Sequence, residues 1–235
     1  MFGTLVNVAA ICAGGLVGLL LRGGLKERFR DIIMQGVALA VLFVGMSSAL
    51  SNMLKPEANP ILFIISLALG AFLGEALGIE AALQRLGNWL QSKVKTKEAQ
   101  GNIAEGFVAA SLLFCVGTMA ILGPLESGLQ NQHSILFAKS VLDGIAALVM
   151  ASTLGVGVLF SAASVFVYQG AITLLAVWVS PYLTPDMLRE LTIVGGIMIT
   201  GLGLNMLNIT KIKVGNLLPA LFVPVVYYLV LGLFS

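Results

Sequence analysis

Runs of apolar residues, each close to twenty residues long, follow one another along almost the whole chain. Eight runs can be delimited, at about 3–22, 32–51, 60–79, 104–123, 135–154, 157–180, 190–208 and 215–234. A helix needs roughly 20 apolar residues to cross a bilayer, and the runs lack the alternating pattern of a membrane β-barrel. Only 10% of the residues are charged. The sequence therefore predicts an all-α integral membrane protein, a single polytopic domain over 1–235 with about eight transmembrane helices.

Lysine and arginine are distributed unequally between the connections on alternate sides of these runs. If the N-terminus lies outside, the outward connections hold only Lys55 and Arg189. Because cytoplasmic loops carry the excess of basic residues, we predict that both termini lie on the outer side of the membrane, away from the cytoplasm. The connection at 153–157 is uncharged, and the prediction depends on its separating two helices. The inward connections hold the other ten: Arg22, Lys26, Arg28, Arg30, Arg85, Lys93, Lys95, Lys97, Lys211 and Lys213.

The segment 80–103, between the third and fourth runs, is more polar than the runs themselves. Its spacing of apolar residues predicts an amphipathic helix on the cytoplasmic membrane face, with Trp89 at headgroup level, followed by a polar linker. The runs within 104–154 then form central helices. The residues that carry the helical spacing are Ile79, Leu83, Leu86, Leu90 and Val94.

A weak internal repeat relates the two ends of the chain. The segment that begins at Arg30 aligns without a gap on the segment that begins at Arg189. If repeat 1 is 1–79 and repeat 2 is 157–235, five spans separate equivalent positions, so the two three-helix halves insert with opposite orientation. Inverted repeats are typical of secondary transporters, whose sites lie near the midplane where the halves meet. Similar small residues in unrelated helices are the alternative explanation.

The fifth run contains two opposite charges four residues apart, Lys139 and Asp143. This spacing places both side chains on one face of a helix. A charge at the bilayer centre costs about 2.5–3.5 kcal/mol on insertion scales, so an ionisable residue there is a candidate functional site. The pair can equally serve the packing of a helix bundle. The sequence leaves both interpretations open.

Two more acidic residues are candidates for the same site. Glu75 lies about one turn inside the cytoplasmic end of the third run, where it needs a cation, a proton or water. In the fourth run, Thr118 precedes a Gly123-Pro124 pair. Since proline removes a backbone donor and disfavours helix at the residue before it, we expect the helix to break near Gly123. Glu126, just beyond, is either a further site residue or a solvated acid at a helix end.

Uncharged amides occur at helix ends and interiors, and together they can line a polar path. Each alone is more often a structural hydrogen bond between helices, worth about 0.6 kcal/mol. The amide candidates are Asn7, Gln35, Gln169, Asn205, Asn208 and Asn216.

Glycines such as Gly70, Gly74 and Gly78 predict close helix packing, which allows a homo-oligomer as well as packing within one chain.

Motifs of the common enzyme classes do not occur in the sequence. His133 is the only histidine, which excludes an HExxH zinc site, and no GxxxxGK[ST] phosphate loop is present. We therefore expect a protein that is not an enzyme, uses no cofactor and has no nucleic-acid partner. The pattern assigns no ligands to a metal.

Three segments, LLFCVGTMAILG, KSVLDG and GLGLNMLNITKIKVGNLLPAL, follow one another in the order that a known family shows. The chain resembles, over nearly its whole length, the bacterial integral membrane family called domain of unknown function 554. The resemblance implies a multi-span inner-membrane protein, often described as a candidate transport protein, and it brings no established substrate or catalytic residue. The matching motifs contain Gly117, Thr118, Lys139, Asp143, Asn205, Lys211, Lys213, Asn216 and Pro219.

Together these features predict a secondary transporter or facilitator for a small polar or charged solute or ion. Asp143 would titrate or bind an ion, and Lys139 would compete for Asp143. The expected partners are the lipid bilayer and the solute. An ion channel is the first alternative. A membrane scaffold without transport activity is the second, and in a scaffold Lys139→Met combined with Asp143→Leu should leave the protein folded and working.

Overall fold

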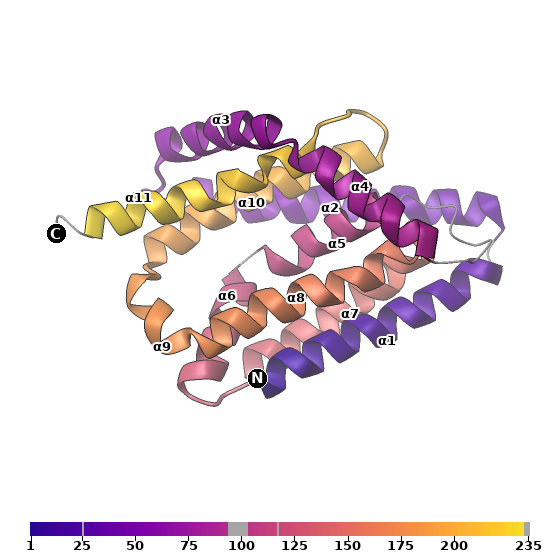
Figure 1. Ribbon diagram of the computed structural model, residues 1–235, viewed down its shortest axis with the longest axis horizontal. Helices are drawn as coiled ribbons and strands as arrows, with labels where there is room; N and C mark the ends of the chain where they lie inside the picture. The colour runs from indigo at the N-terminus through magenta and orange to yellow at the C-terminus, as the bar shows by residue number, and fades with distance from the viewer. Residues whose placement is uncertain (25, 94–102, 117, 233–235) are drawn as a thin grey trace. The chain divides into compact units, whose positions relative to one another are not determined.

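The chain is helical in the computed structural model, which describes residues 1–24, 26–93, 103–116 and 118–232 (Figure 1). No strand occurs in these ranges, so the predicted all-α class is confirmed. Two 3-10 helices are η1 (Ser180–Tyr182) and η2 (Val214–Leu221). The α-helices are α1 (Phe2–Gly24), α2 (Glu27–Met53), α3 (Pro60–Leu77), α4 (Ile79–Lys93), α5 (Ile103–Cys115), α6 (Thr118–Leu129), α7 (Ser134–Leu154), α8 (Gly157–Leu174), α9 (Ala176–Val179), α10 (Pro185–Met206) and α11 (Phe222–Gly232).

Seven helical segments in the described part of the chain are long and apolar enough to cross a membrane. The helices α5 and α6 pass the same test jointly, and counting this bent pair as one span gives eight. Length and composition therefore confirm an integral membrane protein with about eight spans. The seven are Phe2–Arg22, Asp31–Met53, Pro60–Leu77, Ser134–Leu154, Gly157–Leu174, Pro185–Met206 and Val214–Gly232.

The fourth predicted run is broken, but at a different place from the one expected. Helix α6 continues through Pro124, and α5 and α6 are bent by 58° relative to each other. The prediction of a break near Gly123 is therefore wrong. Pro124 lacks the N–H that would donate to Ala120, which lies in the first turn of α6, so the proline removes one hydrogen bond near the helix start. Gly117, between the two helices, lies outside the described residues.

The last predicted run, 215–234, is not one continuous α-helix. Its first part is η2, eight residues of 3-10 helix, and α11 completes it. Pro219 and Pro224 lack the backbone donors that an α-helix needs in its interior. A 3-10 helix of this length is uncommon, so the packing around it must hold it in place.

The segment predicted to be amphipathic is helical, as α4. Its place on the cytoplasmic membrane face stays a prediction. The linker residues 94–102, with Lys95 and Lys97, lie outside the described residues, and so do the side chains of Leu86 and Leu90.

Polar caps begin two of the membrane helices. The side-chain oxygens of Asn59 and Thr184 each accept the backbone N–H three residues further on, at 3.2 Å. A proline follows each cap, and proline suits the first helical position because its N–H would be unpaired there anyway. Helix α10 therefore begins several residues before the predicted run at 190, which brings Arg189 and Glu190 inside the helix.

The chain divides into two compact units, each described here by itself. Helices α1, α5, α6, α7 and α8 belong to unit 1, and α3, α10, η2 and α11 belong to unit 2. The single membrane domain over 1–235 stays a prediction. Unit 1 comprises Met1–Val37, Leu83–Cys115 and Met119–Trp178, and unit 2 comprises Ala38–Ala82, Val116–Thr118 and Val179–Ser235.

In unit 1, α1 packs closely against α7 (Figure 1). A Cβ atom on Gly3 would come within 2.9 Å of the Leu136 Cβ, and one on Gly14 would overlap the carbonyl oxygen of Gly144. Gly3 precedes Gly14 on α1, and their contacts Leu136 and Gly144 follow in the same order on α7. The helices α1 and α7 are therefore parallel. The absence of a side chain at Gly3 and Gly14 therefore lets the two helices approach closely.

Helix α8 runs antiparallel to α1, and therefore to α7. The hydroxyl oxygens of Thr4 and Thr173 lie 3.4 Å apart, whereas Gly15, further along α1, meets Leu159 near the start of α8. The uncharged connection at 153–157 thus separates two helices, as the orientation prediction requires. Gly155 turns the chain there with a φ of 81°, which favours glycine. The sixth predicted run, 157–180, ends earlier than expected, because α8 stops at residue 174.

In unit 2, two glycines of α3 pack against the 3-10 segment η2. A Cβ atom on Gly70 would lie within 2.6 Å of the Ala220 Cα, and one on Gly74 would overlap the carbonyl oxygen of Asn216. The close packing predicted for these glycines is confirmed. Gly78 has a different role, because it caps α3 in the left-handed conformation with a φ of 62°.

Adding one methyl group to α1 is expected to destabilise unit 1. In a Gly14→Ala protein the new Cβ would meet the backbone of Gly144, which cannot rotate away, and overpacking of this kind costs about 1–3 kcal/mol. Gly36→Ala is the matched control, since no atom lies within 4 Å of its added Cβ. We expect the thermal midpoint in detergent to fall for Gly14→Ala and to stay level or rise slightly for Gly36→Ala. Equal midpoints would contradict the close α1–α7 contact.

Candidate functional site

The predicted pair on α7 forms a direct, buried ion pair. The Nζ of Lys139 lies 2.8 Å from Oδ1 and 2.7 Å from Oδ2 of Asp143. Both residues are only 6% exposed, and Asp143 lies near the middle of the helix. A buried pair must be well hydrogen-bonded to offset the loss of hydration of both charges. The further contacts of Asp143 therefore decide what this pair can do.

Two amides from the neighbouring spans complete a four-residue cluster. Asn7 of α1 donates from Nδ2 to Oδ2 of Asp143, at 2.9 Å, and to Oε1 of Gln169 of α8, at 3.3 Å. Asn7 and Gln169 are fully buried. We call Lys139, Asp143, Asn7 and Gln169 the α7 cluster. Four predicted site candidates thus meet in one place within unit 1: the ion pair and two amides that lie far apart in the sequence.

The helix packing explains how the amides reach Asp143. The small residues of α1 let its backbone approach α7 closely, and small residues at an interface allow this in membrane helices generally. Asn7 lies between the contact glycines Gly3 and Gly14 on α1, on the part of the helix that faces both α7 and α8. The short Asn side chain can therefore bridge the two helices.

The α7 cluster leaves hydrogen-bonding capacity unused. Among the described residues, no partner is found for Oδ1 of Asn7 or for Nε2 of Gln169, and both atoms are buried. Buried polar atoms of native proteins are usually paired with protein or water. The unpaired acceptor and the unpaired donor beside the buried ion pair can each form one more hydrogen bond, to water or to a bound solute.

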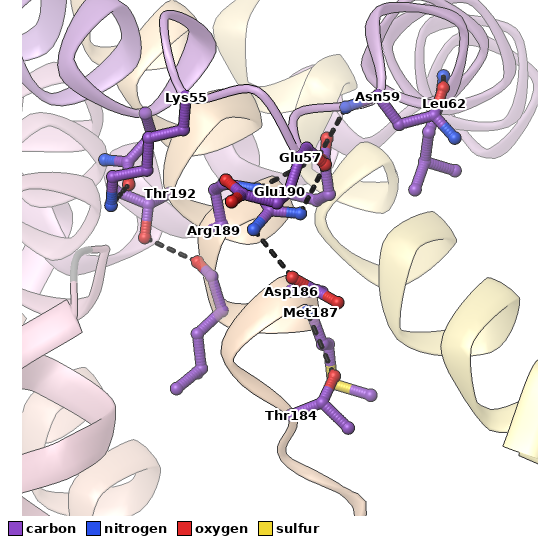
Figure 2. A network of polar contacts seen from close by, with 12 residues as sticks. Lys55, Glu57, Asn59, Leu62, Thr184, Asp186, Met187, Arg189, Glu190 and Thr192 are labelled. Atoms are coloured by element: carbon purple, nitrogen blue, oxygen red, sulfur yellow. Dashed lines mark hydrogen bonds and ion pairs between the residues drawn. The ribbon is translucent and has the colours of Figure 1, made fainter.

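A second buried charge cluster lies in unit 2, where Arg189 links several groups (Figure 2). Its guanidinium donates to Asp186, 2.6 Å from Nη1, and to the backbone carbonyl of Glu57, 2.5 Å from Nη2. Its Nε lies 3.6 Å from Oε1 of Glu190, which also accepts the backbone N–H of Asn59 at 2.9 Å. Arg189 and Glu190 thus tie the start of α10 to the connection between α2 and α3.

The sequence prediction missed this cluster. Arg189 was expected in an outward connection, yet it is 8% exposed, and Glu190 is fully buried. The signal that could have found it is the Thr184-Pro185 pair, which is typical of a helix start. A helix that begins at Pro185 places Arg189 and Glu190 inside a span, where charges need partners.

The two candidates Glu75 and Asn216 meet in a third polar group, also in unit 2. The Glu75 carboxylate accepts from Lys213 at 2.7 Å and from Asn216 at 2.6 Å. Asn216 in turn accepts the backbone N–H of Glu80 at 2.7 Å. The side chains of Glu75 and Lys213 are each 60% exposed. The group holds the end of α3 to the start of η2, and its exposed ion pair is worth little by itself.

The remaining candidates lie apart from these groups. Asn205 stabilises the connection between α10 and η2. Its side chain donates to the carbonyl of Ile212 at 2.6 Å and accepts the N–H of the same residue at 2.8 Å. Gln35 is exposed on α2. Glu126 has a buried Oε2 without a partner in the described part of the chain, and no contact with Lys139 is described. The side chain of Thr118 lies outside the described residues.

Comparison with known proteins gives a family over nearly the full chain. The model of a family described as "Protein of unknown function (DUF554)" matches residues 2–229. "Uncharacterized membrane protein YdfK" of Bacillus subtilis (strain 168) is 39% identical over 235 residues, 100% of this chain and 99% of that protein. "Uncharacterized protein YqgA" of Escherichia coli (strain K12) is 30% identical over 225 residues, 94% of this chain and 93% of that protein. No solved structure matches the chain.

These matches agree with the membrane spans and with the resemblance seen in the sequence motifs. Because the family model and both relatives extend over almost the whole chain, this chain is a membrane protein of the DUF554 family.

Proposed function

We propose that the protein is a secondary transporter or facilitator that moves a small polar or charged solute across the bacterial inner membrane. The observation that carries the proposal is the α7 cluster, a buried ion pair of Lys139 and Asp143 that two amides from other spans surround. Ionisable residues inside membrane spans commonly mark substrate or ion pathways. The cluster joins three apolar helices at one polar point.

The energetics of buried ion pairs support a functional use of the cluster. Replacing such a pair by apolar residues of similar volume is often neutral or even stabilising, so stability alone does not require Lys139 and Asp143. The unpaired atoms of Asn7 and Gln169 are unfavourable for packing alone. Both features favour a site that a solute or ion completes.

The pair also provides a physical mechanism for switching. A cation or proton at Asp143 competes with the Lys139 ammonium, which then loses its partner and must find another. A solute that binds one arrangement of the helices better than the other shifts the population toward that arrangement. Alternating access follows if the two arrangements open the cluster to opposite sides of the membrane.

Two observations support inverted halves and the proposed orientation. In unit 2, Gly45 of α2 contacts Thr200 of α10 and Leu42 contacts Gly203, so the two helices are antiparallel, as equivalent helices of an inverted repeat are. The ten-to-two excess of basic residues favours an orientation with both termini on the periplasmic side. In this orientation, Lys213 and Glu75 lie at the cytoplasmic end of unit 2.

A thermal-stability screen tests the proposed function. The purified protein is heated in detergent with inorganic ions and small metabolites, from acidic to alkaline pH. A solute at about 100 times its dissociation constant adds roughly 2.7 kcal/mol to the stability of the folded state. We expect at least one solute to raise the midpoint of the wild type and to have no effect on Asp143→Asn.

Asp186→Asn is the control for the screen, because it makes the same chemical change at a half-exposed carboxylate of unit 2. It should keep the response to the solute. A response that survives Asp143→Asn would place the site elsewhere. If no solute changes the thermal midpoint of the wild type, the membrane scaffold is favoured. Conduction without saturation in liposomes would favour the channel.

A further inference from the structure

The charge of Asp143 fixes the orientation of both amides in the α7 cluster. A carboxylate can only accept hydrogen bonds, so Asn7 must turn its NH2 group toward Oδ2 of Asp143, as it does at 2.9 Å. The second hydrogen of the same NH2 group points to Gln169, whose Oε1 accepts it at 3.3 Å. The amide oxygen of Asn7 and the amide nitrogen of Gln169 then have no hydrogen-bond partner among the described residues.

The unused atoms have opposite hydrogen-bonding character. Oδ1 of Asn7 is an open acceptor, and Nε2 of Gln169 is an open donor, each on a fully buried residue. A bare cation would satisfy only the acceptor, and a bare anion only the donor. A ligand that fits this cluster brings both a donor and an acceptor.

The cluster is also neutral in net charge. Lys139 and Asp143 cancel, and Asn7 and Gln169 carry no charge. Outside the cluster, α8 carries no charged residue, α1 carries Arg22, and α5, which packs against α7 and α8, carries Glu105 near its start. Arg22 lies beside Gly155, the residue that caps the C-terminal end of α7. Adding a lone ion would leave one uncompensated charge among apolar helices, which is strongly unfavourable. A ligand without net charge avoids this penalty.

From these two properties we infer that the α7 cluster binds a small zwitterion of the α-amino-acid class. The ammonium group of the solute takes the place of the Lys139 ammonium at Asp143 and donates to Oδ1 of Asn7. The carboxylate of the solute accepts from the freed Lys139 ammonium and from Nε2 of Gln169. One buried ion pair becomes two, every open polar atom gains a partner, and the net charge does not change. The inference rests on the proposed function, because it names the solute class of the same site.

The test compares four probes of similar size in the thermal assay at constant ionic strength: glycine, methylammonium, acetate and acetamide. Glycine carries both charges, the next two carry one each, and acetamide is neutral with a donor and an acceptor. We expect glycine alone to raise the midpoint of the wild type. Asp143→Asn should abolish this shift.

A second variant keeps the test independent of the ion pair. Gln169→Met removes the open donor, together with the Oε1 that accepts from Asn7, and leaves Lys139 and Asp143 in place. It should therefore fold and show a smaller glycine shift than the wild type. An equal glycine shift in the wild type and Gln169→Met would overturn the inference.

The outcomes separate the solute class from the proposed function. If methylammonium, acetate or acetamide stabilises the wild type in an Asp143-dependent way and glycine does not, the zwitterion assignment is wrong and the transport proposal stands. If none of the four probes and none of the solutes in the wider screen shifts the midpoint, both are overturned.

Discussion

A Lys139→Met protein is expected to have a much lower free energy of unfolding than the wild type. The substitution leaves the Asp143 carboxylate 6% exposed, with the Asn7 amide as its one remaining described partner. Removing one partner of a buried ion pair costs about 3–5 kcal/mol, because the other charge stays buried without compensation. The measurement is thermal or denaturant unfolding of the purified protein in detergent.

Adding Asp143→Leu to Lys139→Met should restore most of that loss. The double variant has no buried charge in the α7 cluster, and apolar replacements of buried pairs are often neutral in stability. Some loss remains, because the Nδ2 of Asn7 no longer has its carboxylate acceptor. Lys211→Met, on an exposed connection, is the matched control and should change stability by no more than about 0.5 kcal/mol. A Lys139→Met protein as stable as this control would show that the pair is not buried.

The second large effect is expected at Arg189. Arg189→Met leaves Glu190, which is fully buried, without its positive neighbour and leaves the Glu57 carbonyl without its guanidinium donor. We expect a loss of about 3–5 kcal/mol, as for other buried pairs that lose one partner. The connection between α2 and α3 should open at the same time, which hydrogen exchange of its backbone amides would detect.

Arg28→Met is the matched control for this change. Arg28 is exposed and stacks over the Phe29 ring, 4.9 Å from its centroid, and an exposed contact of this kind is worth about 0.5–1 kcal/mol. If Arg189→Met and Arg28→Met unfold alike, the second cluster contributes no more than a surface contact. In that case its burial within unit 2 would be wrong.

The membrane helices were predictable from sequence because the bilayer imposes a strict length and apolarity on each span. The same constraint made Lys139 and Asp143 conspicuous, since two charges in an apolar run need partners, and their spacing on one helix fixed their pairing. Gly70 and Gly74 were recognisable as packing positions for a similar reason, because small residues allow helix backbones to approach in lipid.

Contacts between residues far apart in sequence were harder to predict. Asn7 and Gln169 were two amides among six, and only the parallel α1–α7 and antiparallel α1–α8 packing shows that they meet at Asp143. Pro124 was expected to end a helix, but a proline in the second turn of α6 removes only one hydrogen bond. Arg189 lies just before the predicted run at 190–208, whereas the cap at Thr184 starts α10 at Pro185 and brings Arg189 inside the helix.

The most direct test of the account is counterflow of radiolabelled glycine in proteoliposomes loaded with unlabelled glycine. A carrier exchanges solute across the membrane, so wild-type vesicles should accumulate label transiently above equilibrium. The double variant with Lys139→Met and Asp143→Leu should fold and show no accumulation beyond that of empty liposomes. Equal accumulation by the folded double variant and the wild type would contradict the central claim that the α7 cluster is the transport site.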